Sequence, residues 1–167
     1  AEINILENKF DTALDFLDEA KKIDKNFKNL NYFYGEIFFN KREFSRAENF
    51  YEKELKLYPK SDLSLFGLAR IKEGSFLREE AISLYEKSLD IKKTLWALIN
   101  LAILYQDIDK LDEAEELLIQ AIEINSKFYK TYSNLSSLYE KKGELDEACR
   151  CAHEAIHSYG LSPNKNQ

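Results

Sequence analysis

The sequence predicts an all-α fold, an α-solenoid of stacked antiparallel helix pairs. Two prolines and five glycines in 167 residues supply too few turns for a strand-and-turn protein, whereas long helices need almost none. One short phrase also recurs five times at a nearly constant interval, and the apolar residues around each copy follow helical spacing. Both features indicate repeated helical units that stack on one another.

The recurring phrase is centred on an alanine. Its copies are FDTALDFLDEA, FSRAENFYEKEL, REEAISLYEKSL, LDEAEELLIQAI and LDEACRCAHEAI. Successive alanines are 34, 34, 33 and 34 residues apart, at Ala13, Ala47, Ala81, Ala114 and Ala148. An interval this constant indicates tandem copies of one supersecondary unit.

A second phrase lies upstream of four of these alanines and supplies the other half of each unit. Twelve positions before the alanine stands a small residue, namely Gly35, Ala69, Ala102 or Ser136. A large apolar residue precedes each one, namely Tyr34, Leu68, Leu101 or Leu135. Offsets of three, four and seven mark one face of an α-helix. Each unit is therefore two amphipathic helices that approach closely where the small residues lie.

These phrases define the expected helices and segments. We expect helices near residues 10–23, 29–41, 44–57, 62–73, 77–90, 94–107, 111–124, 128–141 and 145–158. The segments are a partial repeat at 1–27 that begins inside a first helix at Ala1, full repeats at 28–61, 62–94, 95–128 and 129–162, and a polar tail at 163–167. Because Gly74 comes two residues early, the first helix of the second full repeat should be short.

The pattern resembles the tetratricopeptide repeat, whose signature runs W-x2-L-G-x2-Y, then A-x3-F, then P. The matching residues of the first full repeat are Tyr34, Gly35, Phe38, Ala47, Tyr51 and Pro59. Two departures are Lys72, where an aromatic residue is usual, and Glu54, in a column of small residues. The resemblance covers the whole chain. It implies a right-handed superhelix whose first helices line a concave groove for a partner protein.

The same columns give the candidate partner-binding residues of that groove. They are Tyr32, Glu36, Phe39 and Asn40 in the first full repeat, Leu63, Phe66 and Arg70 in the second, Trp96, Ile99, Asn100 and Ile103 in the third, and Lys130, Ser133, Asn134 and Ser137 in the fourth. Aromatic anchors dominate the energies of many interfaces, and an apolar helix or extended segment would fill such a strip. The alternative for each apolar member is core packing between repeats, above all for Leu63 and Ile99. Phe33 is ambiguous in the same way.

The expected function is a protein–protein interaction scaffold that binds a partner peptide or helix in a largely apolar groove. The alternatives are an oligomerisation module that assembles through uncapped repeat ends and a regulatory segment of a larger multidomain protein. Some members of the family clamp the tails of heat-shock chaperones with Lys, Asn and Arg residues. We do not expect that mode here, because the matching positions hold Phe66, Arg70, Asn100, Lys130 and Asn134.

Charge and motifs argue against other classes of function. A net charge of −6, with no local basic run, repels a phosphate backbone, so nucleic acid is not an expected ligand. No apolar stretch approaches the roughly 20 residues needed to cross a bilayer, and the N-terminus does not resemble a signal peptide. No phosphate loop or hydrolase or protease motif is present. We therefore expect neither an enzyme nor a cofactor.

Two groups of polar residues have simple interpretations. Cys149, His153 and His157 share one helix face, as metal ligands could, but a fourth ligand is missing, so no metal site is expected. Glu115 and Glu116 are interpreted as part of a solvated outer face. Because the chain opens without an initiator Met and contains no Met at all, we expect an excised segment or a mature form. The sequence leaves the compartment unknown; we expect a soluble protein, with the cytoplasm slightly favoured over the periplasm.

Overall fold

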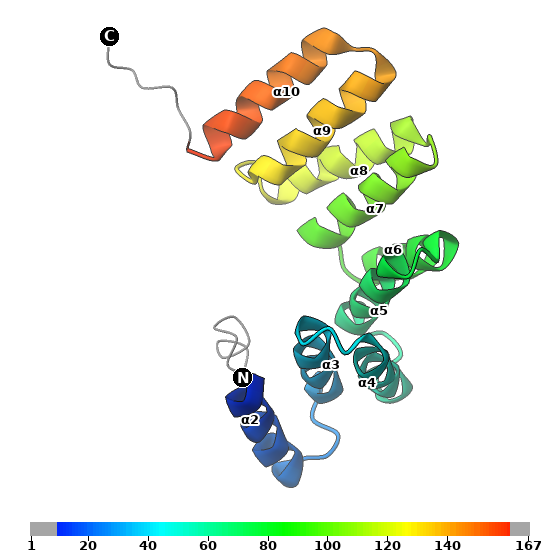
Figure 1. The fold of residues 1–167 in the computed structure, drawn as a ribbon, viewed down its shortest axis with the longest axis vertical. Helices are drawn as coiled ribbons and strands as arrows, with labels where there is room; N and C mark the ends of the chain where they lie inside the picture. The colour runs from blue at the N-terminus through cyan, green and yellow to red at the C-terminus, as the bar shows by residue number, and fades with distance from the viewer. Residues whose placement is uncertain (1–9, 161–167) are drawn as a thin grey trace. The chain divides into compact units, whose positions relative to one another are not determined.

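The computed structural model describes residues 10–160, and within that range it contains nine α-helices and no strand (Figure 1). The helices are α2 (Phe10–Ile23), α3 (Leu30–Asn40), α4 (Phe44–Leu57), α5 (Asp62–Gly74), α6 (Arg78–Ile91), α7 (Leu95–Asp107), α8 (Leu111–Ile124), α9 (Tyr129–Lys142) and α10 (Leu145–Ser158). Every bound lies within one residue of the expected one, so the all-α prediction is confirmed. The expected helix start at Ala1 and the polar tail at 163–167 lie outside the described residues.

Helix α5 is not short, and that expectation was wrong. The helix has 13 residues and ends at Gly74, so it is as long as α7. A Cβ added to Gly74 would meet no other atom within 4 Å, and the Ser75 hydroxyl donates to the Ile71 carbonyl at 2.9 Å. Gly74 is the last residue of the helix, where low helix propensity costs little.

The turn inside each full repeat has the same backbone geometry. Just after the first helix, one residue adopts a positive φ: Arg42 at 62°, Phe76 at 60°, Asp109 at 63° and Gly143 at 79°. The next N–H donates to the carbonyl five residues earlier at 2.9 Å in every copy, as Glu43 does to Phe38. This Schellman-type cap satisfies carbonyl groups that the helix end leaves free and turns the chain into the second helix. Since only one of the four residues is glycine, the sequence did not reveal the positive φ at this position of the turn.

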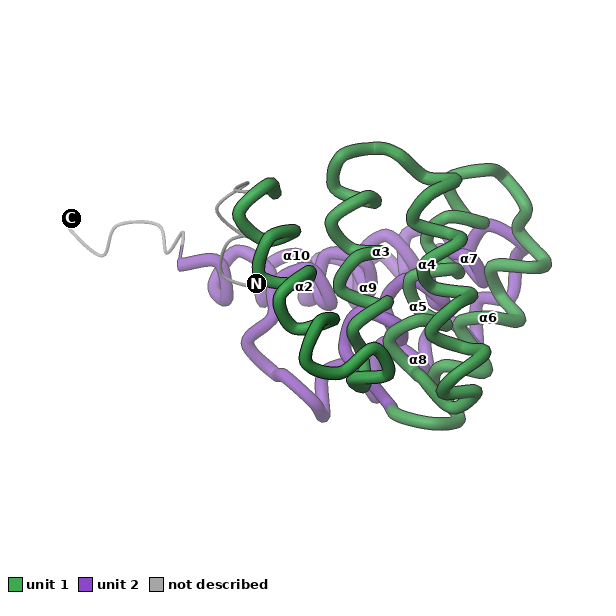
Figure 2. The backbone as a smooth tube through the Cα atoms, turned by 90° about the horizontal axis from the view of Figure 1, so that it is seen from below, with its two compact units in different colours: residues 1–92 green, residues 93–167 purple. Residues whose placement is uncertain are grey.

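Within the described residues, the chain divides after Lys92 into two compact units (Figure 2). In the first, each of the helices α2 to α6 packs on the next, and α3 also touches α5. In the second, each of the helices α7 to α10 packs on the next, and α7 also touches α9. Consecutive helices are joined by short turns and run antiparallel, so each unit is a stack of helix pairs.

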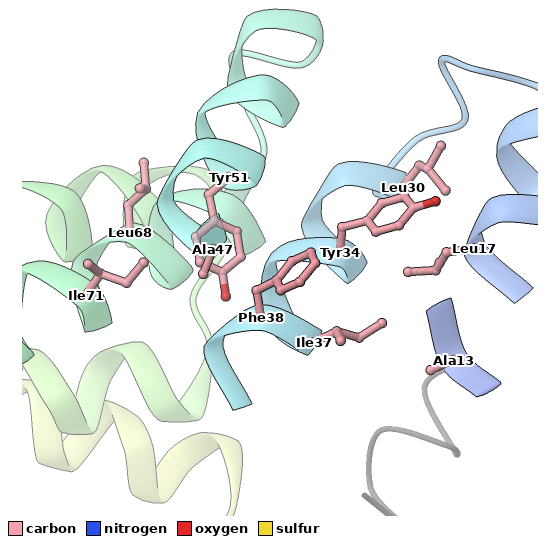
Figure 3. Packing of buried hydrophobic residues seen from close by; sticks show 10 residues of the cluster. All are labelled: Ala13, Leu17, Leu30, Tyr34, Ile37, Phe38, Ala47, Tyr51, Leu68 and Ile71. Carbon is pink, nitrogen blue, oxygen red and sulfur yellow. The ribbon is translucent and has the colours of Figure 1, made fainter. Parts of the chain in front are cut away.

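The small residues lie where helices cross. The five alanines of the recurring phrase are all buried. In the first unit, buried side chains from α2, α3, α4 and α5 form one apolar cluster that includes Ala47 and Tyr51 (Figure 3). A Cβ on Gly35 of α3 or on Gly67 of α5 would come closer than 3.0 Å to the Tyr51 ring. Glycine at both positions therefore lets α3 and α5 approach the ring of a fully buried tyrosine.

The two departures from the repeat pattern have specific partners. Glu54 is fully buried, and its carboxylate accepts hydrogen bonds from the backbone N–H groups of Asn29 at 2.6 Å and Asn31 at 3.1 Å. An anion at this place caps the N-terminus of α3, where free N–H groups and the helix dipole favour negative charge. Lys72 lies 2.8 Å from Glu48, so an ion pair replaces the usual aromatic contact.

Glu115 is not part of a solvated face, and that interpretation was wrong. It is half-buried and accepts hydrogen bonds from the Tyr139 hydroxyl at 2.7 Å and the Lys142 ammonium at 2.6 Å, both on α9. These two bonds, that of Lys142 first, lower the pKa of the Glu115 carboxyl. Burial, together with the bond to Glu115, raises the pKa of Tyr139 to about 12. The cluster ties α8 to the first helix of the following repeat.

Candidate functional site

In the first unit, the candidate residues of α3 and α5 form one connected cluster. The Arg70 guanidinium lies 3.2 and 3.3 Å from the two carboxylate oxygens of Glu36. Its central carbon is 3.8 Å from the centre of the Phe39 ring and 5.7 Å from that of Phe66. The side chains of Arg70 and Glu36 are 26% and 16% exposed, so water screens their attraction only partly. The charge of Arg70 is therefore already engaged by one carboxylate and two rings.

The buried Tyr51 of α4 contacts this cluster through Glu36 and Tyr32. Its hydroxyl donates to Glu36 at 2.5 Å, and its buried ring lies 6.0 Å from the ring of Tyr32. Burial, followed by the charge of Glu36, raises the pKa of Tyr51 above its usual range, while Arg70 acts in the opposite direction. The phenol therefore stays protonated at neutral pH and serves as a donor that holds Glu36 in place.

A small pocket of about 150 Å³ adjoins the cluster. It is lined by Phe39, Phe44, Arg70, Ile71, Gly74 and Ser75. Phe44, which the sequence did not single out, lies edge-on to Phe39 at 5.4 Å and is 47% exposed. In the sequence, only the position of Phe44 as the first residue of α4 could have indicated this contact. The turn before α4 brings that residue back to the end of α3, where Phe39 lies.

The remaining candidates of the first unit lie around this cluster. Leu63 and Phe66 are half-buried on α5, and the Phe66 ring lies 5.7 Å from that of Tyr85. Asn40 is exposed, and its amide donates to the Glu36 carbonyl at 2.7 Å. Phe33 lines a second pocket, of about 280 Å³, whose lining residues are apolar in type: Phe16, Leu17, Ala20, Phe27, Leu30 and Phe33. The sequence did not predict this pocket between α2 and α3.

In the second unit, Trp96 and Lys130 form the centre of the candidate site. Trp96 lies in the first turn of α7 and is 47% exposed. Its ring meets the edge of Phe128 at 5.0 Å, and the Lys130 ammonium, from the first turn of α9, lies 5.1 Å from its centre. A cation over an indole face is attracted by the ring quadrupole. The two neighbouring first helices thus present an aromatic surface with one positive charge.

The other candidates of the second unit differ in accessibility. Asn100, Ile103 and Asn134 are half-buried, and the Asn134 amide donates to the Lys130 carbonyl at 2.9 Å. Ser133 and Ser137 are exposed. Ile99 is only 2% exposed, so its assignment to the binding surface was wrong. Helix α7 packs on both α8 and α9, and its buried surface is therefore wider than the single stripe that the repeat columns suggested.

Residues 10–160 contain no group of three side chains placed to hold a metal ion, and Cys149, His153 and His157 are exposed. None of the helices between residues 10 and 160 combines the length and apolar character needed to cross a bilayer. The titratable groups of the first-unit cluster are paired with one another.

Comparison with known proteins places the sequence among repeat proteins. The family model described as tetratricopeptide repeat matches residues 94–127 and 130–160. No curated protein sequence matches the chain.

Solved structures share its fold across most of its length. MamA 41-end from Desulfovibrio magneticus RS-1 is 17% identical with a TM-score of 0.78, over 98% of this chain and 93% of that one. YrrB, described as a protein of the same repeat type with an unusual peptide-binding site, is 19% identical with a TM-score of 0.75, over 85% and 74%. PilW, a type IV pilus biogenesis factor, is 15% identical with a TM-score of 0.82, over 97% and 76%. At these identities the likeness shows an all-α helical repeat fold.

Proposed function

Because this chain carries tetratricopeptide repeats, we propose that it is a protein-interaction scaffold that holds a peptide or helix of a partner on its first helices. The observation that carries the proposal is Trp96, a large aromatic side chain left 47% exposed beside Phe128 and beneath Lys130. Tryptophan in such a setting offers a wide apolar contact at a low cost in conformational entropy. The peptide-binding site named for the structurally similar YrrB supports the same function.

The side chains of this surface indicate which residue types a bound partner segment would carry. An apolar side chain would pack on Trp96 and in the angle between its ring and that of Phe128. Lys130 is exposed and would donate to a carboxylate or a backbone carbonyl of the segment. In the first unit, Glu36 and Arg70 already neutralise each other, so the partner would use Phe39 and Phe44 and the pocket between them. We therefore propose binding of an apolar segment with an acidic neighbour.

We propose binding without catalysis. In the first-unit cluster, Glu36 is held by Arg70 and Tyr51 together, and the raised pKa of Tyr51 makes it a poor base at neutral pH. At the second-unit surface the charged group of the site, Lys130, lies over an aromatic ring, where it can attract and orient a partner.

A peptide-display selection on the intact chain tests the proposal. Trp96 is the sole tryptophan of the sequence, so its emission reports directly whether a selected peptide covers it. Affinities of labelled peptides would then be measured by fluorescence anisotropy for the wild type and for Trp96→Ala. Truncating an aromatic anchor costs about 2 kcal/mol or more, which is about a thirtyfold loss of affinity.

The control is Ile119→Ala on the second helix α8. Ile119 is 46% exposed, against 47% for Trp96, so the two substitutions remove apolar surface of similar accessibility. We expect Ile119→Ala to leave affinity unchanged and both variants to keep the helical circular dichroism of the wild type. Equal affinities for Trp96→Ala and wild type, or loss of the fold in Trp96→Ala, would contradict the proposed site.

A further inference from the structure

Helix α10 carries an apolar stripe that remains accessible in the described part of the chain. The stripe consists of Leu145, Cys149, Ala152 and Ile156 of α10 and of Tyr159, the residue just after its end, at intervals of four, three, four and three residues, so they follow one face. The Tyr159 ring also lies edge-on to that of Tyr129 on α9, at 4.8 Å. Leu145, Ile156 and Tyr159 are 65%, 48% and 57% exposed, and Cys149 is exposed as well. Three large apolar side chains exposed in one line are uncommon on a helix that faces only water.

The preceding repeat shows what this face does elsewhere. Positions 34 residues earlier, on α8, include Glu115 and Leu118. Leu118 is fully buried, and Glu115 binds Tyr139 and Lys142 of α9. On α8 the face is thus covered by the next helix, which runs antiparallel to it. On α10 the equivalents of Glu115 and Leu118 are the neutral Cys149 and the small Ala152.

We infer that the stripe of α10 binds the same stripe of a second copy of this chain, antiparallel, about a two-fold axis at Ala152. The spacing of the side chains supports this occupant, because a large apolar residue lies at each end of the stripe and a small residue lies at its centre. Leu145 and Tyr159 are each seven residues from Ala152, while Cys149 and Ile156 are three and four residues from it. A two-fold interface requires a surface that is complementary to itself.

The polar side chains beside the stripe are also complementary to themselves. Asp146 and His157 lie on the same flank, near opposite ends of α10. Antiparallel pairing about Ala152 places Asp146 of one copy beside the partner's His157, and this contact occurs twice. The other charged or titratable residues of that flank are Arg150 and His153, so no two carboxylates face each other across the pair. Glu147, which pairs with Arg150, and Glu154 point away from the stripe.

The small residue at the centre permits close contact. Helices pack about 8–10 Å apart, and the Cα atoms lie about 2.3 Å from each axis, so the two Ala152 Cα atoms would be about 3–6 Å apart. The helix has 14 residues and is therefore about 21 Å long. An interface of this length is small, and we expect a reversible, concentration-dependent dimer.

Sedimentation velocity of the whole chain over a concentration series is the first test. The wild type should show a monomer–dimer equilibrium, and Ile156→Glu should raise its dissociation constant at least tenfold. Ile119→Glu is the matched control, because Ile119 and Ile156 are 46% and 48% exposed and only Ile156 lies on the stripe. Trp96→Ala should leave dimerisation unchanged, which separates this inference from the proposed peptide site. A monomer at every concentration, or a dimer that Ile156→Glu does not weaken, would overturn the inference.

Cross-linking tests the position of the axis. In a Cys149→Ser, Cys151→Ser background, Ala152→Cys should form a disulfide-linked dimer with oxidised glutathione, because disulfides join Cα atoms about 4.4–6.8 Å apart. Glu154→Cys, on the opposite side of α10, should remain monomeric under the same conditions. In the wild type, Cys149 should not form a disulfide with the partner's Cys149, because the two residues would be about 9 Å apart in the direction of the helix axes. Equal yields from Ala152→Cys and Glu154→Cys would show that this axis is wrong.

Discussion

Replacing Gly67 by alanine tests the close packing of α5 against Tyr51. The added Cβ would lie closer than 3.0 Å to three atoms of the Tyr51 ring. The ring is fully buried, Gly35 of α3 contacts it as well, and its hydroxyl is held by Glu36. Tyr51 therefore cannot move aside without disturbing the crossing of α3, α4 and α5.

The expected magnitude combines two opposing effects. Overpacking a close-packed core costs about 1–3 kcal/mol, occasionally more. Alanine is about 1 kcal/mol better than glycine inside a helix, which offsets part of this cost. Since three ring atoms are too close and the ring is confined, we take the upper end and expect a net loss of about 2 kcal/mol in the free energy of unfolding.

Denaturant unfolding followed by far-UV circular dichroism measures this loss, and Gly74→Ala provides the control. Gly74 lies at the end of the same helix, and a Cβ there would meet nothing within 4 Å. Gly74→Ala should therefore leave the stability unchanged or raise it by less than about 1 kcal/mol, because only a small propensity effect remains at the end of a helix. If Gly67→Ala were as stable as the wild type, or both substitutions shifted the midpoint in the same direction, the packing argument would be refuted.

Two further predictions concern a turn and an ion pair. Phe76→Gly should raise the free energy of unfolding by up to about 1 kcal/mol, measured by thermal unfolding. Phe76 is 92% exposed and has a φ of 60°, a left-handed conformation that is unfavourable for a residue with a Cβ but not for glycine. A loss of stability would show instead that the Phe76 ring contributes packing. Glu115→Gln should cost at most about 1 kcal/mol at neutral pH. The lowered pKa of Glu115 means that this difference persists above the ordinary value of 4.5 and disappears as the pH falls through the folded-state pKa. A difference that grows on acidification would contradict this assignment.

Much of the fold followed from periodicity alone. The interval between the alanines and the apolar spacing around them placed every helix bound within one residue, because a helix pair of fixed length recurs with nearly the same turns. The repeat pattern also identified the buried alanines, since only a small side chain fits where two helices cross. These features depend on local spacing, which a single sequence displays directly.

The candidate site was only partly predictable. The structure places Phe39 and Glu36 of the predicted set in contact with Arg70, and Trp96 beside Lys130. The repeat columns placed Ile99 on the surface, although α7 buries it by packing on two neighbours. A position in the repeat predicts the direction in which a side chain points from its own helix. The exposure of that side chain depends on which other helices lie on that side.

The sequence by itself determined the helices, their pairing and the small residues at their crossings. Tertiary structure alone decided the partners of the polar residues. Glu54 caps the start of α3, 23 to 25 residues earlier in the chain, and Glu36 is held between Tyr51 and Arg70, 15 and 34 residues away. Apolar burial follows a periodic pattern because it is non-directional. A hydrogen bond or ion pair depends on distances of a few ångströms between elements, and no periodicity in the sequence encodes those distances.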